Sequence, residues 1–101
     1  MIELNKLYLK LKPTHIAILI YFFINKNEVS LNKINYSFRL TFYKYCNELH
    51  NMGLLEKENS FKDERVVVYR LSKKGYNIAK RLYEIYILLK EDNNYGKGDK
   101  S

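Results

Sequence analysis

The chain has 101 residues, which is enough to bury one hydrophobic core and too few for two. Hydrophobic residues make up 47% of the sequence and charged residues 29%, and this balance excludes a disordered or fibrous chain. Lys and Arg number 18 against 11 Asp and Glu, and the net charge of +7 favours a polyanionic partner, either nucleic acid or an anionic membrane surface.

The cysteine and histidine content restricts the chemistry further. The single cysteine, Cys46, cannot form an internal disulfide, and two histidines alone cannot make an ordinary structural zinc site. The longest apolar run, Ile16 to Ile24, has nine residues, whereas a membrane-spanning helix needs about 20. Charged residues interrupt Met1 to Lys12, so this segment lacks the apolar block of a signal peptide. We therefore expect a cytoplasmic protein without a metal, a cofactor or a membrane contact.

Two helices are predicted in the first third of the chain. Proline is tolerated in the first turn of a helix, so we expect a first helix from Pro13 to Ile24, apolar on nearly all sides. Ser30 can cap a short second helix from Leu31 to about Ser37. The residues before Pro13 are compatible with either an extended or a helical segment.

A third helix is expected from Thr41, a favourable N-cap, to Gly53, which can adopt the left-handed conformation past the last turn. Apolar residues recur there at three- and four-residue steps and predict a buried stripe of Phe42, Tyr45, Cys46, Leu49 and Met52. The other face carries Thr41, Tyr43, Lys44 and Asn47.

A β-hairpin and a final helix complete the predicted order. The strand candidates are Leu54 to Glu58 and Arg65 to Leu71, separated by polar residues. Ser72 can cap a last helix over about residues 73 to 91, whose apolar surface is wider than one small domain can cover. Residues 92 to 101 lack apolar periodicity and are expected to form a disordered tail.

The wide apolar surface of the last helix predicts a homodimer interface. Interfaces favour aromatic residues, and tyrosine in particular. The same side chains could enclose a small aromatic effector, but an interface explains them without any ligand. The predicted interface consists of Tyr76, Ala79, Leu82, Tyr83, Tyr86 and Leu89.

This order of elements predicts an α+β fold that is mainly α. It is the order of a winged helix-turn-helix domain, here over residues 1 to 91, with a three-helix core, a β-hairpin wing and a C-terminal dimerisation helix. The third helix of such a unit can enter the major groove of DNA, which is about 12 Å wide.

Two segments resemble the MarR family of winged-helix proteins. Residues 49 to 55 are similar to the family's L-x-x-x-G-L-[LIV] junction, and residues 63 to 75 are similar to its wing, D-x-R-x-x-x-V-x-L-[TS]-x-K-G. Tyr69 departs from the wing pattern, where the family usually has an aliphatic residue. The matching wing positions are Asp63, Arg65, Leu71, Ser72, Lys74 and Gly75.

The resemblance covers about residues 13 to 90 and implies a dimeric DNA-binding regulator whose wing arginine contacts phosphate or the minor groove. Family members usually have a long N-terminal helix, whereas only 12 residues precede Pro13 here. A dimer would then rest mainly on residues 76 to 90, with Met1 to Leu11 as a further contributor. The small size and the abundance of Lys, Asn, Ile and Tyr are similar to compact winged-helix proteins of archaea and their viruses.

Seven residues form the predicted DNA-binding set. Arg39 and Asn47 have the geometry to read base edges, whereas hydroxyl and ammonium groups on the same face can reach phosphates. Arg65, at the hairpin tip, can enter a narrow A·T-rich minor groove. The alternative is a solvated helix face beside a solvated charged turn, but the predicted wing favours DNA contact. The set is Arg39, Thr41, Tyr43, Lys44, Asn47, Lys62 and Arg65.

Other candidate sites are weaker. Cys46 and His50 lie four residues apart and could share a metal or a redox signal, but Cys46 falls within the buried stripe, which favours a structural role. His15 is expected to be a surface histidine or one with satisfied hydrogen bonds. The sequence has no catalytic motif, so we do not expect an enzyme.

The sequence therefore predicts a homodimeric, sequence-specific transcriptional regulator that binds double-stranded DNA. The fold and the resemblance imply a small repressor that acts by occupying a promoter, whereas no residue determines the sign of regulation. Two alternatives remain open: a protein-interaction module of the transcription or replication machinery, and a sensor that responds to a small-molecule effector.

Overall fold

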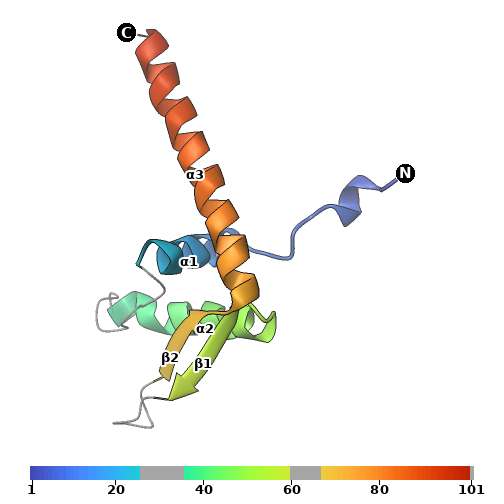
Figure 1. The fold of residues 1–101 in the computed structure, drawn as a ribbon, viewed down its shortest axis with the longest axis vertical. Helices are drawn as coiled ribbons and strands as arrows, with labels where there is room; N and C mark the ends of the chain where they lie inside the picture. Colours follow the sequence, from blue (N-terminus) through green and yellow to red (C-terminus); the bar gives the residue numbers. More distant parts are fainter. Residues whose placement is uncertain (26–35, 60–66, 101) are drawn as a thin grey trace.

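The structure is a computed structural model that describes residues 1–25, 36–59 and 67–100. Within these ranges, helices α1 and α2 and a hairpin form the body of the molecule, and the long helix α3 leaves this body along its longest axis (Figure 1). The fold is mainly helical with one antiparallel hairpin, as predicted for a winged helix-turn-helix domain. The elements are η1 (Leu4–Lys6), α1 (Pro13–Ile24), α2 (Tyr36–Asn51), β1 (Leu55–Asn59), β2 (Val67–Leu71) and α3 (Lys73–Lys100).

Helix α1 begins where the proline predicts it. Lys12 is the extended N-cap residue, with φ −76° and ψ 159°, and Pro13 occupies the first turn, where its missing N–H is not needed. The side chains of Ile18, Leu19 and Phe22 are buried. Residues 1 to 10 are exposed, and they form an arm that extends sideways from the body (Figure 1).

Helix α2 begins at Tyr36, upstream of the predicted N-cap Thr41, which is therefore an interior residue of the helix. Phe38 lies one turn before Phe42, and their ring centroids are 6.4 Å apart. Side chains four positions apart on a helix contact each other and stabilise it, so this ring contact supports the additional turn before Thr41, although Phe38 itself is exposed. The predicted second helix, from Leu31 to about Ser37, lies almost entirely outside the described residues.

The end of α2 is as predicted. Gly53 has a φ of +81°. This left-handed conformation is unfavourable for any residue that has a Cβ atom, whereas glycine adopts it readily. The Leu54 N–H donates to the Leu49 oxygen and the Gly53 N–H to the His50 oxygen, both at 2.9 Å. This pair of bonds closes the helix and directs the chain into β1.

The hairpin and the start of α3 are held to this turn by a few short contacts. Leu55 pairs with Leu71 and Lys57 with Tyr69 across the two strands. The Ser72 hydroxyl donates to the Gly53 oxygen at 2.6 Å and accepts the Gly75 N–H at 2.9 Å, so it caps α3 as predicted. A Cβ at Gly75 would lie 1.9 Å from the Leu54 oxygen, and only glycine allows this close approach.

One core fills the space between α1, α2, the hairpin and the base of α3. Its buried members are Ile18, Leu19, Phe22, Phe42, Cys46, Leu49, Leu54, Leu55, Tyr69, Leu71 and Ala79. Of the predicted stripe on the third helix, Tyr45 is half-buried and Met52 is exposed. The buried face of α2 is therefore narrower than the sequence predicts.

Helix α3 is longer than the core requires. It has 28 residues and is thus about 42 Å long. It continues to Lys100, past the predicted end at residue 91 and through the segment that was predicted to be a disordered tail. The radius of gyration is 16.3 Å, compared with about 13 Å for a compact domain of this size, because α3 and the N-terminal arm project from the body. Among the described residues, no helix combines the length and the apolar content needed to cross a bilayer.

Candidate nucleic-acid interface

One face of α2 carries an exposed polar row. Thr41, Lys44 and Asn47 are exposed and are spaced three residues apart, so they share one side of the helix. Phe42, Cys46 and Leu49 anchor the opposite side in the core. Asn51 is also exposed and lies one turn beyond Asn47, which extends the row to the end of the helix. The four-residue step from Asn47 could have indicated this position in the sequence.

Two predicted members lie at the margin of this face rather than on it. Arg39 and Tyr43 are half-buried. The Tyr43 ring packs edge-on against Tyr69 of β2, with the centroids 6.2 Å apart and the planes at 64°. Tyr43 is thus not the fully exposed tyrosine that the sequence predicts, because the side of α2 that carries it is turned toward the hairpin.

Asn47 is linked to both strands of the hairpin. Its Oδ1 accepts the Tyr69 hydroxyl at 2.5 Å and the Lys57 ammonium at 3.2 Å. Burial raises the pKa of Tyr69 to about 12, with the neighbouring Cys46 and Tyr43 contributing, so its hydroxyl keeps its proton near neutral pH. The Lys57 ammonium lies 5.8 Å from the centre of the Tyr69 ring.

Lys57 is a site residue that the sequence analysis missed. It is exposed and lies opposite Tyr69 in the ladder, so its side chain lies on the hairpin face that meets α2. The alternation of residues along the two strands could have indicated this position. The predicted tip residues, Lys62 and Arg65, lie outside the described residues.

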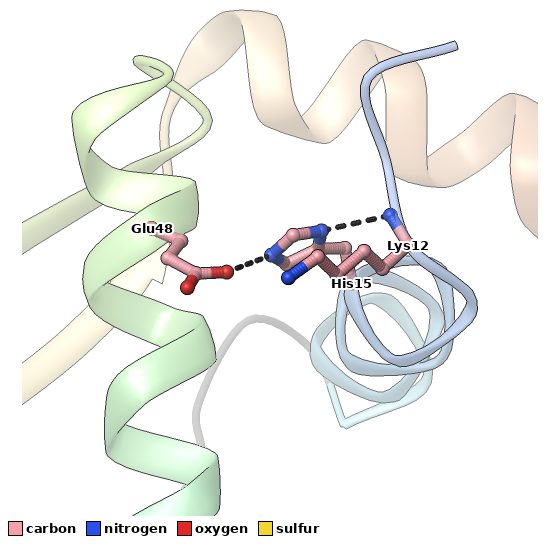
Figure 2. A network of polar contacts seen from close by, with 3 residues as sticks. All are labelled: Lys12, His15 and Glu48. Carbon is pink, nitrogen blue, oxygen red and sulfur yellow. Dashed lines mark hydrogen bonds and ion pairs between the residues drawn. The ribbon is translucent and has the colours of Figure 1, made fainter. Parts of the chain in front are cut away.

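His15 connects the start of α1 to α2 (Figure 2). Its Nδ1 accepts the Lys12 backbone N–H at 2.9 Å, and its Nε2 lies 2.7 Å from Oε1 of Glu48. Because Nδ1 is an acceptor, the hydrogen of the neutral ring lies on Nε2 and is donated to Glu48. His15 is only 2% exposed. It is therefore a buried histidine with satisfied hydrogen bonds and not a surface histidine. This bridge holds the polar face of α2 in a fixed orientation relative to α1.

Cys46 and His50 do not face a common ligand. The Cys46 side chain is fully buried, and burial raises the pKa of its thiol to about 12, whereas metal binding requires a thiolate. The His50 Nδ1 donates to the Leu55 oxygen at 2.9 Å. In the part of the chain that the structure describes, no three potential metal ligands cluster. The interpretation of Cys46 as a core residue is confirmed.

The predicted dimer residues of α3 divide into two groups. Ala79 is fully buried in the protomer, and Leu82 and Tyr83 are half-buried, so these three help to attach α3 to the body. The Tyr83 ring lies 5.3 Å from Phe23 of α1. The prediction that Ala79 is part of the dimer interface is therefore wrong, because its small side chain is covered by the same protomer.

The second group is exposed. Tyr76 is 47% exposed, Tyr86 40% and Leu89 59%, and Tyr76 also contacts the Phe23 ring at 5.5 Å. Ile85 and Leu88 are similarly exposed; they fall within the predicted span of residues 76 to 90 but were not named among the interface residues. The exposed apolar side chains thus lie mainly on the part of α3 that has left the body.

Comparisons with solved structures establish the fold. The chain is similar to a variant of ZitR from Lactococcus lactis, with a TM-score of 0.69 and 22% identity over 92% of this chain and 64% of that one. It is also similar to FabT from Streptococcus pneumoniae in complex with DNA, with a TM-score of 0.60 and 20% identity over 90% of this chain and 72% of that one. At 22% and 20% identity, the likeness to both neighbours shows the fold, and it agrees with the winged helix-turn-helix fold predicted from the sequence. The chain spans less than two thirds of the length of ZitR.

Sequence comparison identifies the family more closely. No curated protein sequence matches the chain. The family model described as "Transcriptional regulator SarA/Rot" matches residues 1–82, which include the body of the molecule and the base of α3. The chain belongs to the SarA/Rot family of transcriptional regulators.

Proposed function

We propose that this regulator binds double-stranded DNA as a homodimer and reads sequence with α2 in the major groove. The observation that carries the proposal is the exposed polar row of Thr41, Lys44 and Asn47, which is backed by the core and flanked by the hairpin. An α-helix fits the major groove, and the row offers hydroxyl, ammonium and amide groups for phosphates and base edges. Arg39 and Tyr43 would contact DNA at the edge of this face.

The hairpin would follow the DNA backbone beside the major groove. Lys57 adds a positive charge between the polar row and the wing. Lys62 and Arg65 are proposed as the wing contacts to phosphate or the minor groove, which the charge of the tip and the resemblance to the MarR wing support. The net charge of +7 favours the same polyanionic partner.

The dimer would form through the projecting part of α3. A single protomer leaves Tyr86, Leu89 and their neighbours exposed, whereas a second copy would cover them. Two α2 helices would then contact half-sites separated by one helical turn, about 10 bp, or a small multiple of it.

Selection from a pool of random-sequence duplexes tests this function. We expect an enriched site with two-fold symmetry. On that site, Lys44→Ala should weaken binding and reduce the slope of log affinity against log salt concentration by about 0.9, because one phosphate contact is lost. Lys80→Ala, on exposed α3, is the matched control and should leave the slope unchanged.

Two results would contradict the proposal. One is the absence of any retained duplex at low salt, which would favour a protein-interaction module instead. The other is a salt titration of Lys44→Ala that overlays the wild type, which would remove the α2 face from the DNA interface.

A further inference from the structure

The bonds around Asn47 determine what this residue can offer to DNA. A free asparagine side chain presents one acceptor and two N–H donors, and it reads adenine by using both kinds together. Here Oδ1 accepts two bonds, from the Tyr69 hydroxyl and the Lys57 ammonium. A carbonyl oxygen has two lone pairs, so its acceptor capacity is used within the protein.

The contact with Lys57 also fixes which way the amide points. An ammonium group can only donate, so the amide atom 3.2 Å from it is the oxygen and not the nitrogen. Asn47 is exposed, and its amide nitrogen forms no hydrogen bond with the described residues. The two N–H donors are therefore available to a partner.

Tyr69 is held firmly enough to keep this arrangement. Its side chain is 3% exposed, and its ring lies between the Tyr43 ring on one side and the Lys57 ammonium on another. The hydroxyl thus has a fixed position beside α2. Tyr69 is also the position at which this chain departs from the aliphatic residue of the MarR wing pattern, so the arrangement depends on a residue that the pattern does not supply.

We propose that Tyr69 is a positioning residue which makes Asn47 a donor-only reader of DNA, selective for guanine over adenine. Guanine presents two acceptors, O6 and N7, in the major groove, and these match the two N–H groups of the amide. Adenine presents one acceptor and one donor, and its N6 amino group would meet a second donor instead of the oxygen it needs. This inference rests on the proposed function, because it assumes that the α2 face contacts base edges.

The test compares base preferences among selected duplexes for the wild type and for variants of Asn47 and of its two hydrogen-bond donors. The wild type should prefer guanine at one position of each half-site, and Asn47→Ala should lose that preference. Tyr69→Phe keeps the ring but removes the hydroxyl, so Oδ1 regains an acceptor site. The guanine-to-adenine ratio at that position should then fall by about fivefold, which is the effect of about one net hydrogen bond.

A double-mutant cycle separates positioning from a general effect on structure. In the Asn47→Ala background, Tyr69→Phe should not change the base preference further, because the amide through which it acts is absent. Lys57→Met removes the second donor from an exposed residue and should shift the same base position in the same direction as Tyr69→Phe. Tyr21→Phe removes an exposed hydroxyl from α1 and should leave the base preference as in the wild type.

The possible failures are distinguishable. If the wild type selects no duplex, the proposed function fails and this inference fails with it. If the wild type selects a site but Tyr69→Phe and Lys57→Met keep its base preferences, only the positioning role is overturned. An Asn47-dependent preference for adenine in the wild type would also overturn the inference alone.

Discussion

His15 shows how a polar residue is accommodated in an apolar interface. It is almost fully buried, yet both ring nitrogens have partners, Lys12 of the same helix start and Glu48 of α2. The ring also lies edge-on to Tyr45, with the centroids 5.1 Å apart. Because a buried polar atom without a partner costs free energy, this arrangement makes the contact between α1 and α2 specific for one geometry.

Replacing His15 should therefore cost more than replacing its partner. His15→Ala leaves a cavity and removes the acceptor of the Lys12 N–H, so we expect a loss of about 3 kcal/mol in the free energy of unfolding. Glu48→Gln keeps an oxygen that can accept from Nε2 and should cost about 1 kcal/mol or less. Urea unfolding followed by circular dichroism measures both values. Equal losses in the two variants would mean that the buried ring does not determine this contact.

Among the elements, the two ends of α2 show what a sequence can and cannot predict. The C-terminal end is determined locally, because Gly53 and the following buried Leu54 satisfy the open carbonyl groups. The N-terminal end is not, because Thr41 is a favourable cap by type, yet the helix continues upstream to Tyr36, where the partly exposed Phe38 ring packs against buried Phe42. Contacts between residues that are distant in the sequence could not be predicted either, because they depend on how the helices and strands pack together. Neither the bond from Tyr69 to Asn47 nor that from His15 to Glu48 has a local signature.

The two glycines that flank the hairpin should respond differently to alanine. At Gly53, an added Cβ would meet no atom within 4 Å. The only cost of Gly53→Ala is therefore the left-handed backbone conformation, which should lower the free energy of unfolding by about 1 kcal/mol. At Gly75, the Cβ would collide with the Leu54 oxygen, so α3 must move away from β1. We expect Gly75→Ala to cost about 3 kcal/mol or more and to lower the midpoint of thermal unfolding further than Gly53→Ala. The reverse order would mean that α3 is not packed closely against the start of β1.

The shape of the whole molecule depends on α3, which belongs to the core at its base and leaves it farther along (Figure 1). Ala79 joins the helix to the body, whereas Ile85, Leu88 and Leu89 are all more than half exposed. The sequence pattern predicted one apolar surface over this helix, because periodicity alone does not reveal where the packing against α1 ends. Because the helix is buried at its base and exposed farther along, the proposed dimer contact would lie beyond Tyr83, on the projecting part of the helix.

A charge on the projecting part of α3 should therefore separate the protomers without unfolding them. Leu89→Glu places a carboxylate on an exposed apolar position, and we expect the sedimentation coefficient to fall from that of a dimer to that of a monomer. Lys80→Glu is the control, because nine residues of about 100° each place Lys80 on the opposite side of the helix. Both variants should keep the wild-type circular dichroism spectrum. If Leu89→Glu remains dimeric, the protomers must associate through another surface, and the exposed apolar residues of the N-terminal arm, Ile2, Leu4, Leu7 and Leu9, would be the next to replace.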